Sequence, residues 1–78
     1  MAVDAFILIE VAGDHTRSAF KTIQRIAGVK AVYMVSGGYD LIVHVEAESL
    51  EALGDLLVSK IRAVDGIMKT STCLVLSA

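Results

Sequence analysis

The sequence predicts an α+β fold with the element order strand, helix, strand, strand, helix, strand. Segments rich in β-branched and aromatic residues alternate with two amphipathic helical patterns, each helical pattern ends at a glycine followed by a strand, and a glycine pair separates the two middle strands. This order is typical of the ferredoxin-like, or split βαβ, arrangement, a four-stranded antiparallel sheet with both helices on one face. Right-handed crossovers then place the first and third strands side by side at the centre.

The first strand is expected at Val3–Val11, where one face is wholly apolar and the other carries Phe6 and Leu8 at its middle. A strand that is apolar on both faces is usually buried on both sides. A helix follows, because apolar residues recur at helical spacing before the glycine at position 28: Ala19, Phe20, Ile23, Ile26 and Ala27.

The two middle strands, Val29–Val35 and Leu41–Val45, flank a segment that consists of Ser36, Gly37, Gly38, Tyr39 and Asp40. Glycine pairs supply the positive φ angles that tight hairpin turns need, and they leave backbone N–H groups free of side chains. The segment could be a plain connector, since glycine pairs are an ordinary hairpin signal. A phenol and a carboxylate beside an open turn also suit a site for a small polar molecule.

The second helix is expected from a cap at Ser49 to Asp65-Gly66, with an apolar stripe made of Leu50, Leu53, Leu57, Ile61 and Val64. The last strand, Ile67–Leu76, begins with a polar stretch that contains Lys69, Thr70, Ser71 and Thr72. Cys73 follows in an apolar run. Because a single cysteine forms no internal disulfide, we expect it to be a small core residue in a reducing compartment.

One face of the predicted sheet has no helix to cover it. We expect this face to carry Phe6, Leu8, Val32, Met34 and Ile42, or their neighbours. The chain has 78 residues, a hydrophobic fraction of 55% and a mean hydropathy of +0.67. A domain of this size buries only about 60% of its unfolded surface. We therefore expect a second copy of the chain to cover the open face, sheet against sheet.

Composition argues against several function classes. The charged residues interrupt every apolar run well before the ~20 residues of a membrane span, and no basic start of a signal peptide is present, so a cytoplasmic location is expected. The net charge is -2 and the basic residues are scattered, which argues against direct nucleic-acid binding. No metal-ligand spacing or phosphate-loop motif occurs, so we expect no metal and no cofactor.

A catalytic role is one alternative. His44 and Glu46 lie two residues apart on one strand face, and such a histidine could act as a general base in a small dimeric α/β-barrel enzyme. A strand histidine more often packs at an interface and hydrogen-bonds to a neighbour.

Two segments resemble the C-terminal effector-binding domain of the Lrp/AsnC transcription regulators, the RAM domain. They are Val32–Val43, with its Ser-Gly-Gly-Tyr-Asp turn, and Asp65–Thr72, with glycine and a hydrophobic residue before a Thr-Ser-Thr run. The resemblance covers nearly the whole chain, so we treat residues 1–78 as a single domain. It implies a ferredoxin-like fold, dimers with apposed sheets, and rings of dimers with small effectors, commonly amino acids, bound where dimers meet.

The resemblance also implies site residues and partners. Gly37, Gly38, Tyr39 and Asp40, preceded by Ser36, match the ligand loop of the family, and Thr70, Ser71 and Thr72 match the polar start of its last strand. Met1 lies two residues before the first strand, so we expect the chain to depart from full-length members in having no helix-turn-helix before this domain. It is similar to the stand-alone members, whose partners could include full-length regulators.

The chemistry of these residues suits an amino-acid effector. Asp40 can accept from the ammonium group, while the N–H groups of Gly37 and Gly38 and the hydroxyls of the last strand can donate to the carboxylate. Besides the enzyme, two alternatives stay open. An ACT-like regulatory domain would place its ligand loop at Val11–Asp14, and a structural adaptor would join full-length regulators into mixed oligomers.

Overall fold

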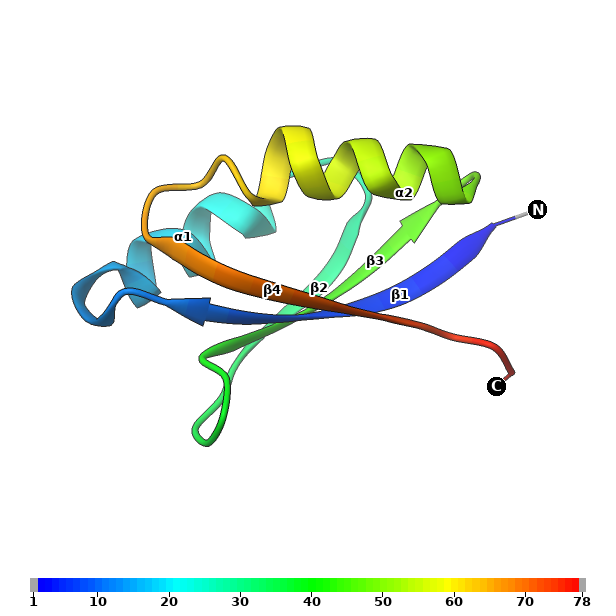
Figure 1. Ribbon diagram of the computed structural model, residues 1–78. Coiled ribbons are helices and arrows are strands. Elements are labelled where there is room, and N and C mark those ends of the chain that lie inside the picture. The colour runs from blue at the N-terminus through cyan, green and yellow to red at the C-terminus, as the bar shows by residue number, and fades with distance from the viewer. Residues whose placement is uncertain (1, 78) are drawn as a thin grey trace.

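A four-stranded antiparallel sheet with strand order β2-β3-β1-β4 forms one layer, and both helices lie on one of its faces (Figure 1). The computed structural model describes residues 2–77. Its elements are β1 (Val3–Val11), a 3-10 turn (Gly13–His15), α1 (Thr16–Gln24), β2 (Val29–Met34), β3 (Leu41–Ala47), α2 (Leu50–Leu56) with a π-helical turn (Leu57–Ile61), and β4 (Ile67–Leu74). The ferredoxin-like prediction is confirmed, including the central position of the first and third strands.

The core lies between the sheet and the helices. Alternate residues of β1 and β3 point toward the helices, as the 2-residue period of a strand requires, and all of them except Val3 and Ala47 are buried. The helices contribute apolar residues from their inner faces. The buried set is Ala5, Ile7, Ile9, Val11, Ala19, Ile23, Leu41, Val43, Val45, Leu53 and Ile61.

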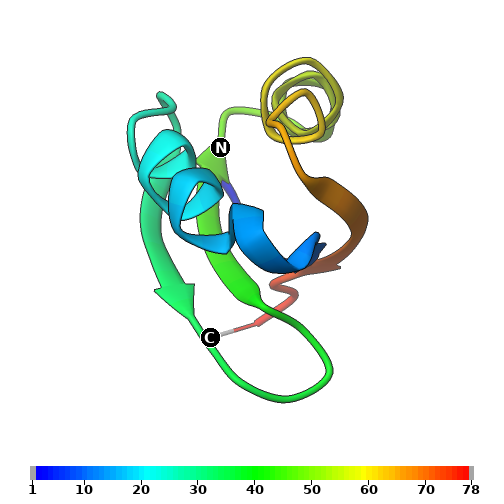
Figure 2. The same ribbon diagram turned by 90° about the vertical axis from the view of Figure 1, so that its left-hand side faces the viewer.

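The two helices lie next to each other above the sheet (Figure 2). Between them is a groove of about 830 Å³, lined by residues that follow α1 and by α2 with its π-helical turn. The π-helical turn ends where the N–H of Arg62 donates to the carbonyl of Leu57 at 2.9 Å. No helix within residues 2–77 has both the length and the apolar character needed to cross a bilayer.

A β-bulge in β2 changes which residues of this strand face the core. The register with β3 shifts between Val29 and Ala31, so Val32 lies opposite Val43 on the helix side of the sheet. Tyr33 instead lies opposite Ile42 on the open face. The prediction that Val32 and Met34 belong to the open face was therefore wrong, because a bulge inserts one extra residue and reverses the alternation beyond it.

Four smaller expectations also need correction. β2 ends at Met34 and β4 at Leu74, each earlier than predicted, and α2 with its π-helical turn ends at Ile61. The N–H of Val75 still donates to the carbonyl of Asp4 at 3.0 Å, which extends the pairing slightly. Cys73 is exposed rather than buried in the core, because it lies opposite Phe6 on the open face of the sheet.

Candidate functional site

The loop between β2 and β3 projects from one end of the sheet, away from the helices (Figure 1). It is wider than a tight turn, since the N–H of Val35 donates to the carbonyl of Asp40 at 2.9 Å. Gly37 has a φ of 137°, whereas Gly38 has no positive φ, so only one of the two glycines uses the conformation that favours glycine. A Cβ added at either glycine would meet no atom within 4 Å. The loop backbone is therefore open to a ligand.

Asp40 holds this loop against the end of β1. Its N–H donates to the carbonyl of Ile9 at 2.9 Å, and its carboxylate Oδ2 accepts from the backbone N–H of Val11 at 2.8 Å. Both contacts lie where the pairing of β1 with β3 ends, at Leu41. The carboxylate thus satisfies a backbone donor that β3 does not reach. Within residues 2–77, no hydrogen bond or ion pair engages its second oxygen, Oδ1, so this oxygen is available to a ligand. Ser36 is exposed and Tyr39 is half-buried.

The three hydroxyl residues of β4 do not lie on one face. Thr70 and Thr72 lie opposite the buried Ile9 and Ile7 and thus on the helix side of the sheet, while Ser71 lies opposite Leu8 on the open face. Thr70 shares a row with Ile9 and Leu41, the residue next to Asp40. Because β1 lies between β3 and β4, the β2–β3 loop and the polar start of β4 are about 10 Å apart, which is two strand spacings.

The structure therefore places the loop and the polar start of β4 at the same end of the sheet, on either side of β1. Beside Thr70 lies a hollow of about 330 Å³, which is also lined by Arg62, Ile67, Met68 and Lys69. Arg62 and Lys69 were not among the site residues predicted from the sequence, because isolated basic residues carry no motif. Within residues 2–77, no group of three or more His, Cys, Asp or Glu side chains is placed to hold a metal ion.

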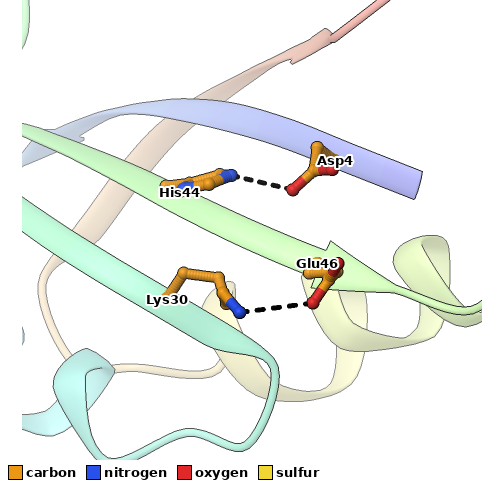
Figure 3. A network of polar contacts seen from close by, with 4 residues as sticks. All are labelled: Asp4, Lys30, His44 and Glu46. Atoms are coloured by element: carbon orange, nitrogen blue, oxygen red, sulfur yellow. Dashed lines mark hydrogen bonds and ion pairs between the residues drawn. The ribbon is translucent and has the colours of Figure 1, made fainter. Parts of the chain in front are cut away.

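The histidine of the alternative enzyme hypothesis has a different partner from the one predicted. His44 Nε2 lies 2.9 Å from Asp4 Oδ1, while Glu46 Oε1 lies 3.3 Å from Lys30 Nζ (Figure 3). The imidazole is also stacked on the ring of Phe6, with centroids 4.7 Å apart. The sequence could not show the contact with Asp4, because the two residues are 40 positions apart.

Residues 4–78 match the sequence model of the Lrp/AsnC ligand binding domain. The chain belongs to this family. An uncharacterised HTH-type transcriptional regulator of Pyrococcus horikoshii is 35% identical over 75 residues, which cover 92% of this chain and 50% of the regulator. The chain therefore spans about half the length of this curated relative. The Lrp/AsnC resemblance predicted from the glycine loop and the Thr-Ser-Thr run is confirmed.

The fold comparison agrees with this assignment. A crystal structure of a Thermus thermophilus protein superposes on the Lrp/AsnC domain with a TM-score of 0.93 and 32% sequence identity, and the match covers 97% of this chain and 95% of that one. A homocitrate synthase of Sulfolobus acidocaldarius is 42% identical over 62 residues, but the match covers only 13% of the enzyme. The likeness to that enzyme is thus confined to a small part of its sequence.

Proposed function

We propose that this Lrp/AsnC domain is a regulatory module that binds a small effector, an amino acid, and catalyses no reaction. The observation that supports the proposal most is the β2–β3 loop. Gly37 holds a left-handed backbone with open space around it, and Asp40 in the same loop uses one carboxylate oxygen as the anchor, while its other oxygen has no partner within residues 2–77. An anchored carboxylate next to bare N–H groups suits a zwitterion.

Each group of the proposed site has a role toward the ligand. Asp40 Oδ1 accepts from the ammonium group, while the N–H groups of Gly37 and Gly38 donate to the carboxylate. Ser36 and Tyr39 belong to the same loop and lie on either side of the two glycines. Thr70 and Thr72, on the helix side of β4, belong to the second half of the site, whereas Ser71 lies on the open face that the proposed dimer covers. Because β1 keeps these two halves about 10 Å apart within one chain, the site is completed by a neighbouring chain.

The assembly that we propose begins with a dimer formed through the open sheet face. Phe6 is 37% exposed and Tyr33 is 55% exposed on this face, and Leu8 and Ile42 lie between them at its centre. Apolar surface of this kind favours burial against a partner. Dimers then join into a ring in which the loop of one dimer meets β4 of the next. An effector that binds only the assembled form stabilises the ring by mass action.

The proposed link to transcription runs through protein partners. The net charge of -2 disfavours direct contact with nucleic acid, and both helices bury their apolar faces on the sheet. We therefore place full-length Lrp/AsnC regulators among the partners of the domain. The proposed lack of catalysis is supported by Glu46, the partner of His44 in the enzyme alternative, which pairs with Lys30 instead.

Isothermal titration against the twenty standard amino acids tests the proposal. We expect at least one of them to release or absorb heat in a saturable titration, and Asp40→Asn to weaken its binding at least tenfold. Asn still accepts from the N–H of Val11, so the loop keeps its anchor while the charge is lost. Asp55→Asn, which removes the same charge from an exposed position on α2, serves as the matched control. Flat titrations for all twenty would contradict effector binding by this domain.

A further inference from the structure

His44 lies in the middle of the open face, where it contacts both an apolar side chain, Phe6, and a charged one, Asp4. Its ring is stacked on Phe6 with an interplanar angle of 15°. Figure 3 shows its contact with Asp4, in which Nε2 lies 2.9 Å from Oδ1. With Phe6 and Val75 these two residues line a hollow of about 290 Å³. A partner chain that fills this hollow would exclude water from the pair of His44 and Asp4.

The open face has an excess of negative charge when His44 is neutral. Alternation along the strands places Asp4, Glu10 and Glu46 on this face, and Lys69 lies opposite Glu10. Lys30 reaches Glu46 from β2 at 3.3 Å. Among residues 2–77, three carboxylates of the open face thus meet two ammonium groups, and Asp40 adds a further carboxylate at the end of the sheet. Among the described residues, the other titratable side chains on the face are those of Tyr33 and Cys73, which carry no charge when protonated.

We propose that protonation of His44 strengthens the pairing of the open face with a second copy of the chain, so that a fall in pH drives assembly. This inference rests on the sheet-to-sheet dimer of the proposed function. An imidazole is the side chain whose charge ordinarily changes between pH 5 and 8. Its protonation removes one unit of excess negative charge from each of the two faces that meet.

Desolvation acts in the same direction. When a partner covers the face, the Asp4 carboxylate leaves water, and a buried charge is costly unless an opposite charge pairs with it. A neutral His44 offers Asp4 only a neutral donor, whereas an imidazolium offers a charge-assisted hydrogen bond. The assembled form therefore takes up protons at His44. By linkage, assembly is strongest at low pH and weakens as the pH rises and His44 loses its proton.

The expected effect is large enough to measure. Face-to-face sheets lie about 10 Å apart. Like charges at that separation change an association constant by about tenfold at the effective dielectric constant of a protein surface. We therefore expect the dissociation constant of the dimer to rise about tenfold from pH 5.5 to pH 7.5 at fixed ionic strength. Addition of salt would reduce this difference, because exposed parts of the face are screened.

The chain offers a matched control because it contains two histidines, His15 and His44. His15 lies in the 3-10 turn after β1, near Asp14 and outside the sheet. Analytical ultracentrifugation of the wild type, His44→Gln and His15→Gln at pH 5.5, 6.5 and 7.5 gives a dissociation constant for each protein at each pH. We expect the wild type and His15→Gln to show the tenfold rise, and His44→Gln, in which the amide still reaches Asp4, to show a flat profile.

Three outcomes would overturn the inference. They are a flat wild-type profile, a profile of opposite sign, or a pH dependence that His15→Gln removes and His44→Gln keeps. A dimer with no pH dependence contradicts only the role of His44, whereas a monomer at every pH and concentration contradicts the proposed assembly as well. If the dimer does not dissociate on dilution, the concentration dependence of the urea midpoint at pH 5.5 and 7.5 gives the same comparison, with His44→Gln as reference.

Discussion

The carboxylate of Asp40 accepts a hydrogen bond from the backbone N–H of Val11 across 2.8 Å, which joins the hairpin loop to the end of β1. This contact gives Asp40 a structural role beside its proposed role in binding. The two roles use different oxygens of the carboxylate. One role depends on hydrogen-bond acceptance and the other on negative charge. The acceptor oxygen anchors the loop, while the charge attracts the ligand. Substitutions that keep one property and remove the other separate the two roles.

Asp40→Ala is expected to destabilise the domain, whereas Asp40→Asn is expected to leave it nearly as stable as the wild type. Alanine leaves the part-buried N–H of Val11 without its partner, at a cost of about 1 to 3 kcal/mol in the free energy of unfolding. Asparagine retains an acceptor oxygen. Urea denaturation measures both variants. Equal stability of Asp40→Ala and the wild type would show that water replaces the carboxylate without loss.

Gly37→Ala is expected to cost about 1 to 2 kcal/mol in the free energy of unfolding, because a residue with a Cβ is strained at a φ of 137°. The neighbouring Gly38→Ala is the matched control. Its φ is not positive and a Cβ there meets nothing within 4 Å, so we expect no loss of stability. Thermal or urea unfolding compares the two. A larger loss at Gly38 than at Gly37 would contradict the loop geometry.

Gly66→Ala is expected to be strongly destabilising, by roughly 2 to 4 kcal/mol, because two costs combine. Gly66 has a φ of 90°, and a Cβ at this position would overlap the Cβ of His15, which has little freedom to move. Gly54→Ala gives the opposite expectation. Apart from its chain neighbours and the backbone of its own helix, no atom of the described residues lies within 4 Å of a Cβ at Gly54, and alanine favours an α-helix by about 1 kcal/mol over glycine. Urea denaturation of both variants tests the contrast.

Ile42→Lys is expected to convert the proposed dimer into a folded monomer. Ile42 lies at the centre of the open face, between Leu8 and Tyr33, and a charge there would have no partner when a second copy approaches. Leu50→Lys is the control, because Leu50 is 61% exposed at the start of α2, away from the open face. Size-exclusion chromatography with light scattering gives the mass of each variant. An unchanged mass for Ile42→Lys would argue against pairing through this face.

Local patterns determined the element order and most of the core of this Lrp/AsnC domain. Strand alternation predicted the buried row of β1, and helical spacing predicted Ala19, Ile23, Leu53 and Ile61, because burial on one face of an element imposes a period that the sequence records. The loop residues 36–40 were found in the same way, since adjacent glycines between two strands indicate a hairpin. The family likeness came from these same residues.

Long-range register was decided only in the tertiary structure. The bulge between Val29 and Ala31 moved Val32 to the helix side, and no feature of the local sequence marks it. Likewise the contacts of Asp40 with Val11 and of His44 with Asp4 join residues 29 and 40 positions apart. A side-chain period reports which face an element buries. It carries no information about which strand lies opposite or where a register shifts, because these depend on how all four strands pack together.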